Sequence, residues 1–259
     1  IYKLFNFTMI KIKNSLPPEY NLHIYKEVAS TMVTAKNLVN SGSDVGTVVW
    51  AEKQTKGRGR HGRTWASPAG NLYFSFIRNA EMENKKFLFS HVYIVGLTLA
   101  ESVEGISNGL IKPFLKWPND LLINGSKLAG ILIESFISDS NQNLLNIGLG
   151  INISSSPDNV GYKTTNLKKE NVNIKPKELL VYFFQCLKRN EKIYNKKGLN
   201  FILKKWKNYS HTKNDKLLVK IGNTSLKGLF KGIDKNGALL LEVSDKKIKT
   251  VYAGDVFLL

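Results

Sequence analysis

The sequence of 259 residues contains one cysteine, Cys186, and no long apolar run. One cysteine excludes an intramolecular disulfide and argues against a cysteine-ligated metal site, and the four histidines show no ligand-like spacing. A membrane-spanning helix needs about 20 consecutive apolar residues, and the opening IYKLFNFTMIKIKN is too interrupted by Lys and Asn for a secretory signal. These absences predict a protein with no membrane segment and no protein-held metal, in a reducing, cytoplasmic setting.

Acidic residues are also scarce: the sequence contains 20 Asp and Glu against 38 Lys and Arg. Its net charge is therefore +18. Such a charge is common in proteins that bind nucleic acid. The lysines are scattered along the chain, however, and no motif of a nucleic-acid-binding fold accompanies them. We favour a general excess of lysine on solvated faces and keep a nucleic-acid-binding module as the alternative. Attraction for ATP or an acidic protein is expected in either case.

Arginine is rare, yet three of the five arginines, Arg58, Arg60 and Arg63, fall within GRGRHGR. The pattern G-x-G-x-x-G is typical of dinucleotide-binding loops, but such a loop opens a helix, and here a proline, a glycine and a strand-like stretch follow. The glycines let backbone N–H groups approach an anion, and guanidinium groups donate paired hydrogen bonds to phosphate or carboxylate. A mobile basic surface loop is the alternative. We interpret this segment as a loop that orders around a phosphorylated or adenylated ligand.

Apolar periodicity predicts helices interspersed with strands, followed by a strand-rich end. The expected helices are 31–42, 87–106, 176–195 and 199–209. The expected strands are 46–52, 71–78, 114–117, 120–123, 127–138 and 144–153, then 216–222, 225–234, 238–243 and 248–254. Asn124-Gly125 is a hairpin signal, so the main sheet should be largely antiparallel, unlike a dinucleotide-binding fold. The last four short strands suggest a small β-barrel that begins near residue 212.

Three further polar positions stand out, each with an ordinary structural alternative. Asp120, in KWPND, could hold a metal or a ribose, or it could cap its own turn. Lys127 begins an apolar strand and could meet a carboxylate or phosphate, or it could be an edge lysine. Asn152, in GLGIN, is either a ligand contact or a buried core amide.

The motifs STM (30–32), Gln54 with GRGRHGRTW, KWPND, KLAGILIE and GLGIN, in this order, resemble those of biotin protein ligases. The resemblance runs from about residue 22 to 259 and includes GLFKGIDKNGALLLE. It implies an α+β fold: a mixed sheet with helices like that of class II aminoacyl-tRNA synthetases, plus a small C-terminal Src-homology-3-like β-barrel. The expected domains are an N-terminal tail (1–21), a catalytic biotin- and ATP-binding domain (22–211) and a small barrel (212–259).

The resemblance also implies a two-step reaction. Biotin and ATP, with magnesium, give biotinyl-5′-AMP and pyrophosphate, and the biotinyl group then passes to one lysine of a biotin carboxyl carrier protein or carboxylase subunit. The first step brings a carboxylate to a phosphate, two anions that cations must neutralise and align. We assign this to Arg60 and Lys127, and we give Asp120 a role in orienting or deprotonating the acceptor lysine.

Residue by residue, the resemblance implies two overlapping binding sets. The biotin set is Ser30, Thr31, Met32, Gln54, Arg58, Gly59, Arg60, Lys127 and Gly130. The ATP set is Arg60, Arg63, Trp65, Asn119, Lys127 and Asn152. Met32 departs from the Asn or Asp that the family usually has, so it would not reproduce a polar contact there.

Many bacterial relatives carry a winged helix-turn-helix ahead of the catalytic domain. Only about 20 residues precede that domain in this sequence, so we predict a monofunctional ligase without sequence-specific DNA binding. A lipoate-type ligase is a close alternative, since it shares the fold. A homodimer is possible.

Overall fold

The computed structural model describes residues 15–80, 85–158 and 160–259. Most of the expected tail, residues 1–14, therefore lies outside the described residues. The described end of that tail is not detached, because Leu16 and Tyr20 are buried against the core and the first strand already begins at Asn21. The core thus extends to residues that we had expected to precede it.

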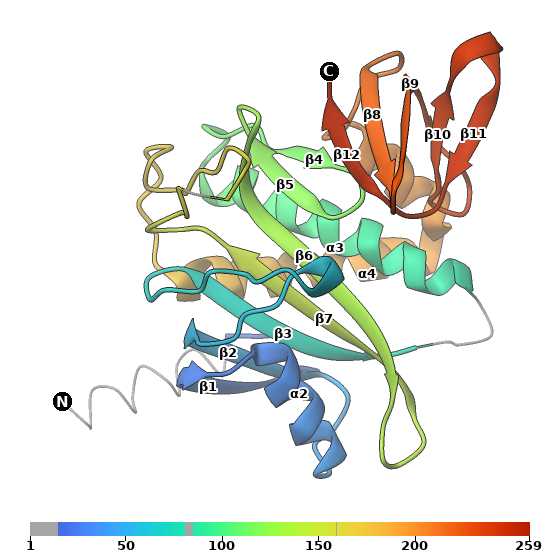
Figure 1. Ribbon diagram of the computed structural model, residues 1–259. Helices are drawn as coiled ribbons and strands as arrows, with labels where there is room; N and C mark the ends of the chain where they lie inside the picture. Colours follow the sequence, from blue (N-terminus) through green and yellow to red (C-terminus); the bar gives the residue numbers. More distant parts are fainter. Residues whose placement is uncertain (1–14, 81–84, 159) are drawn as a thin grey trace.

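A seven-stranded mixed sheet forms the centre of the larger part (Figure 1). Its strands lie in the order β1-β2-β3-β7-β6-β5-β4, and only β1 and β2 run parallel. The bounds are β1 Asn21–Val28, β2 Thr47–Gln54, β3 Leu72–Asn79, β4 Phe114–Lys116, β5 Asp120–Ile123, β6 Ser126–Ile137 and β7 Asn143–Ile151. The predicted, largely antiparallel sheet is confirmed, and β1 is an additional strand.

Three helices cover the two faces of this sheet among the described residues. The helices α3 (Lys85–Ile106) and α4 (Pro176–Lys207) pack together on one face, and the short α2 (Thr31–Asn40) lies on the other. The two helices predicted at 176–209 form one element that breaks at Gly198, where φ is +72°. Glycine permits this left-handed backbone without a steric penalty.

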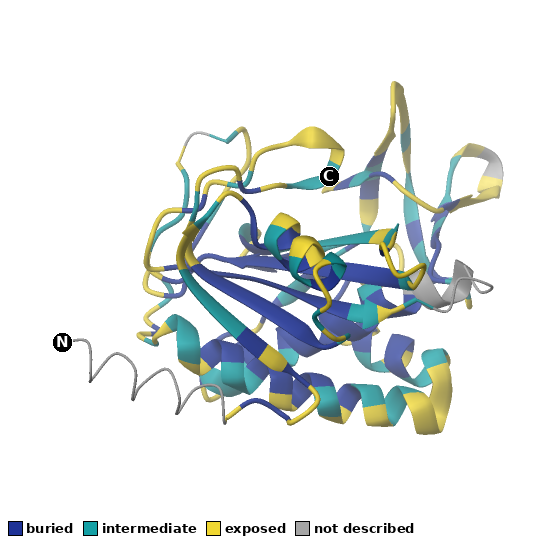
Figure 2. Cartoon of the chain, turned by 90° about the horizontal axis from the view of Figure 1, so that it is seen from below, coloured by how far each residue is buried: buried dark blue, intermediate teal, exposed yellow. Residues whose placement is uncertain are grey.

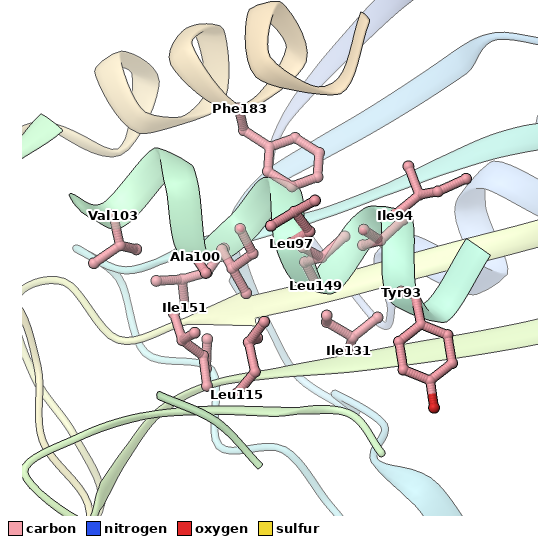
Figure 3. Close-up of a cluster of buried hydrophobic side chains, with 14 of the residues drawn as sticks. Tyr93, Ile94, Leu97, Ala100, Val103, Leu115, Ile131, Leu149, Ile151 and Phe183 are labelled. Carbon is pink, nitrogen blue, oxygen red and sulfur yellow. The ribbon is translucent and has the colours of Figure 1, made fainter. Parts of the chain in front are cut away.

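The main core lies between α3, α4 and the sheet (Figure 3). Leu97 of α3, Ile131 and Leu149 of the sheet and Phe183 of α4 converge there, each at most 4% exposed. Burial of each such side chain stabilises the fold by about 1.5–3 kcal/mol. Figure 2 shows that the central strands of the main sheet are mostly buried, whereas many of the loops are exposed.

The C-terminal part is a separate five-stranded antiparallel sheet in the order β11-β10-β9-β8-β12. Its strands are β8 Lys216–Ile221, β9 Thr224–Ile233, β10 Leu239–Glu242, β11 Ile248–Val251 and β12 Asp255–Leu258. Four of them were predicted, and β12 was not. The Tyr93 hydroxyl on α3 donates to the Gly237 carbonyl at 2.5 Å, which ties this sheet to the larger part.

None of the described helices is both long and apolar enough to cross a membrane.

Candidate functional site

A cavity of about 330 Å³ opens where the main sheet, the arginine loop and the C-terminal strand β12 meet. This volume is in the range of small-molecule sites. All but one of the residues assigned to the site from sequence line it. They are Ser30, Thr31, Met32, Gln54, Arg58, Gly59, Arg60, Arg63, Trp65, Asn119, Asp120, Lys127 and Gly130.

One end of the cavity is polar and uncharged. The Gln54 side-chain oxygen accepts hydrogen bonds from the Thr31 backbone N–H at 2.8 Å and the Thr31 hydroxyl at 3.2 Å. The Gln54 amide nitrogen donates to the Ser67 hydroxyl at 2.9 Å, and the Thr31 and Ser75 hydroxyls lie 2.7 Å apart. These bonds fix the direction of the amide, because its oxygen and nitrogen each already have a partner. Ser30 precedes this network at the N-cap position of α2, where its own side chain makes no capping bond.

Met32 forms the floor of this polar end. Its side chain is 4% exposed and lies against Gly148, where a Cβ atom would be only 2.8 Å from the Met32 sulfur. The Asn146 side chain donates to the Met32 carbonyl at 2.7 Å. Met32 therefore contributes an apolar thioether at this point, and the glycine opposite makes room for it.

Trp65 lies across two glycines of the sheet. A Cβ atom at Gly130 would be 3.1 Å from its ring, and one at Gly150 would collide with its indole nitrogen. That buried nitrogen has no hydrogen-bond partner among the described residues. An unpaired buried donor of this kind is costly to the fold. The Lys127 ammonium sits 5.2 Å from the Trp65 ring centroid, within cation–π range.

Lys127 belongs to a three-membered charge group. Its Nζ is 2.8 Å from Oδ1 of Asp120, whose Oδ2 is 3.4 Å from the Lys116 Nζ. All three side chains are less than a quarter exposed. The register between β5 and β6 shifts opposite Lys127, and such irregularities re-aim side chains. Two lysines around one carboxylate give this part of the cavity lining a net positive charge.

The arginine loop forms the charged end. Arg58 makes two hydrogen bonds to Glu134, at 3.0 and 2.7 Å, and Arg63 makes two to Asp255, both at 3.1 Å. Arg60 donates to the Asn119 side-chain oxygen at 3.0 Å and lies 3.6 Å from Asp255. Protein carboxylates thus occupy guanidinium groups that could bind a ligand phosphate or carboxylate in the same geometry.

The electrostatic surroundings of Asp255 keep it ionised. Burial alone would raise its pKa, but the hydrogen bond and charge of Arg63, with the charge of Arg60, hold the pKa below the ordinary value of 3.8. Burial also lowers the pKa of the Arg60 guanidinium, against the attraction of Asp255 and Asp120. The pKa of each group at the charged end therefore depends on the charges of its neighbours.

Asn152 is the one assigned residue that does not line the cavity. It is 2% exposed and donates to the Thr165 carbonyl at 3.1 Å, an arrangement that fits a core amide. Sequence reasoning missed other lining residues, among them Tyr162 and Asp255. The Tyr162 ring lies 5.4 Å from the Lys127 ammonium. Asp255 is 192 positions from Arg63, so no local pattern could have paired them.

Within the described residues, no group of three or more His, Cys, Asp or Glu side chains could hold a metal ion. The cavity lining includes two carboxylates, Asp120 and Asp255, and both are ion-paired. An oxygen-binding cation would therefore need most of its ligands from another molecule.

The sequence profile of the Biotin/lipoate A/B protein ligase family matches residues 25–152, and that of the Biotin protein ligase C terminal domain matches residues 218–259. The Bifunctional ligase/repressor BirA of Bacillus subtilis is 32% identical over 241 residues, which cover 90% of this chain and 73% of that protein. The Biotin--[acetyl-CoA-carboxylase] ligase of Mycobacterium tuberculosis is 30% identical over 242 residues, covering 91% of this chain and 88% of that protein.

Solved structures agree with these sequence matches. The biotin protein ligase from Aquifex aeolicus in complex with biotin and ATP superposes with a TM-score of 0.77 at 28% identity. The match covers 92% of this chain and 99% of that one. The two profile matches fall on the two sheets whose junction forms the cavity. The chain belongs to the biotin protein ligase family.

Proposed function

We propose that this cavity converts biotin and ATP to biotinyl-5′-AMP and then transfers the biotinyl group to a lysine of a biotin carboxyl carrier protein or carboxylase subunit. The observation that carries the proposal is the joining of a neutral, hydrogen-bonded end to a cationic end in one cavity. Biotin has the matching form, with a neutral cyclic urea at one end and a carboxylate at the other.

The biotin head group would bind at the polar end. Thr31 and Gln54, oriented by Ser67, present donors and acceptors there, and Ser30 lies beside them. Met32 would add apolar contact in place of the polar contact usual in the family. The biotin carboxylate would then point toward Lys127, since this cation lines the same cavity.

The nucleotide would bind at the charged end. Its α-phosphate would compete with Asp255 and Asp120 for Arg60, Arg63 and Lys127, because phosphate accepts the same charge-assisted hydrogen bonds. Trp65, with its unpaired indole N–H, and Asn119 would contact the rest of the nucleotide. Magnesium would enter as part of the ATP substrate, since it is usually held by phosphates with few protein carboxylates.

The cations would then supply the rate acceleration of the first step. The attacking biotin carboxylate is already ionised, so this step needs no general base. Lys127 and Arg60 would reduce the repulsion between the two anions and hold them in line. In the second step Asp120, held between Lys116 and Lys127, would orient the incoming lysine amine.

We place the reaction in a reducing compartment such as the cytoplasm. The single cysteine, Cys186, is buried and free, in agreement with such a setting.

Exchange of labelled pyrophosphate into ATP tests the first step. We expect exchange that requires both biotin and magnesium and that lipoate fails to support. With labelled biotin in place of labelled pyrophosphate, the label should reach an apo-carrier domain when one is added. Exchange that lipoate supports better than biotin would assign the chain to the lipoate side of the family. Absence of exchange with either acid would contradict the proposal.

A further inference from the structure

Exposed apolar side chains gather at the mouth of the cavity. Tyr162, Phe257 and Leu258, which we call the mouth patch, are 48%, 41% and 50% exposed, although each also lines the cavity. They come from opposite sides, Tyr162 from the loop after β7 and the other two from β12. Exposed apolar groups that cluster at one site mark a surface that another molecule covers.

The strand β12 that carries much of this patch is an edge strand. It is the last strand in its sheet and pairs only with β8, through Leu258 and Leu217 among others. Figure 1 shows it beside β4 and β5 of the main sheet, and the Lys116 ammonium lies 5.7 Å from the Phe257 ring. Val256 is buried and anchors the strand, whereas the following two residues, Phe257 and Leu258, are exposed.

Positive charge surrounds the patch. The Lys220 ammonium lies 5.3 Å from the Phe257 ring, and the exposed Lys163 lines the cavity next to Tyr162. The carboxylates of the described lining, Asp120 and Asp255, are both neutralised by ion pairs. A partner for this surface must therefore combine an apolar contact with negative charge.

We propose that the mouth patch and its lysines form the docking surface for the acceptor protein, a folded domain that presents its target lysine from an apolar surface flanked by acidic side chains. The proposal rests on the function proposed above. In the transfer step the lysine nitrogen forms an amide bond to the biotinyl carbonyl carbon, the bond from that carbon to the AMP oxygen breaks, and the amine proton passes to solvent. Because the carbonyl lies inside the cavity, the protein that carries the lysine must cover the mouth.

Two substitutions at the exposed rim of the cavity, at residues to which no biotin or ATP contact is assigned, test this surface. Leu258→Glu places a negative charge in the patch, and Lys163→Glu reverses a charge at its rim. We expect each to raise the KM for an apo biotin carboxyl carrier domain by about tenfold, the effect of losing one strong interface contact. Biotin-dependent pyrophosphate exchange, and transfer to the small nucleophile hydroxylamine, should stay within twofold of wild type. Leu110→Glu is the matched control, since Leu110 is 78% exposed and lies away from the cavity.

Each outcome decides between docking and its alternatives. A carrier KM that is unchanged in both variants overturns the docking surface, even if exchange is normal. A change in self-association by sedimentation, with an unchanged carrier KM, assigns the patch to a second copy of this chain and also overturns it. Absence of exchange in the wild-type protein contradicts the proposed function itself, so the two failures are distinguishable.

Discussion

The two ends of the cavity are held in place by different forces. At the polar end, Thr31, Gln54 and Ser75 satisfy one another through short hydrogen bonds within the main sheet and α2. At the charged end, Arg58 and Arg63 are held by carboxylates far away in the chain, and both ion pairs are more than a third exposed. Exposed ion pairs contribute about 0–1 kcal/mol and weaken with salt.

This difference assigns separate tasks to the two ends of the cavity. The polar end recognises the ligand head group, and the charged end activates the ligand carboxylate. The polar end is built before a ligand arrives, and it can select a neutral head group because its donors and acceptors are already oriented. The charged end holds its arginines with replaceable anions, so a ligand phosphate can take their place at little cost. We therefore expect binding at the polar end to be insensitive to salt and binding at the charged end to weaken as salt rises.

Lys127→Ala should have the largest effect on the charged end. Removing a cation from the point where two anions meet should slow biotin-dependent pyrophosphate exchange by about a hundredfold or more. Lys163→Ala is the control, because Lys163 is an exposed lysine at the mouth of the same cavity. A near-normal exchange rate for Lys127→Ala would show that Lys127 is only an edge lysine of the sheet and does not contribute to adenylation.

Arg60→Gly should affect how long the protein retains the biotinyl-adenylate more than how fast the adenylate forms. Arg60 is partly buried, and its loss removes at least one charge-assisted hydrogen bond from the adenylate, so the adenylate should dissociate about tenfold or more faster. The release rate is measured by filtration after ATP is removed. An unchanged rate would show that the loop does not hold the ligand.

Thr31→Val probes the polar end. The substitution keeps the shape but removes the hydroxyl shared by Gln54 and Ser75, which should lower the free energy of unfolding by about 1–3 kcal/mol. Urea denaturation at low and high salt checks this, and the loss should be the same at both. The exposed Thr224→Val should change it by less than about 0.5 kcal/mol. A loss of stability that depends strongly on salt would contradict the claim that the polar end, unlike the charged end, is held by uncharged hydrogen bonds.

Asp255→Asn should give the smallest effect, and one that depends on pH. The folded protein holds the pKa of Asp255 below 3.8, so the unfolded chain takes up its proton first as the solution is acidified. The stabilisation is therefore present above pH 3.8 and is lost as the pH falls further, through the lowered pKa. The stability difference between wild type and Asp255→Asn should shrink over that acidic range. A difference that is constant with pH would mean that the ion pairs of Asp255 contribute nothing.

The sequence predicted those parts of the molecule whose signals are local. Periodicity placed α3 and most strands, and it predicted two helices, 176–195 and 199–209, where α4 breaks at Gly198. The strand β1 was missed because its burial does not alternate cleanly, with only Leu22 fully buried. The strand β12 was missed because it depends on pairing with the distant β8, which no local pattern shows.

The site shows the same limit. The motifs predicted thirteen of the lining residues, although these come from segments far apart in the sequence. This was possible because each motif has a recognisable residue pattern of its own. The partners of the arginines, Glu134 and Asp255, carry no such signal and could be found only once the chain was folded. Asn152 lay in a motif, yet the fold uses its amide to hold the Thr165 carbonyl.

The most direct test of the two-ended cavity is the amount of biotinyl-adenylate that stays with the protein. The protein is incubated with labelled biotin and magnesium-ATP and passed through a desalting column at rising salt concentrations, without acceptor. We predict about one labelled adenylate per chain at low salt and progressive loss as salt rises. Retention that does not change with salt, or no retained label at any salt concentration, would contradict the account.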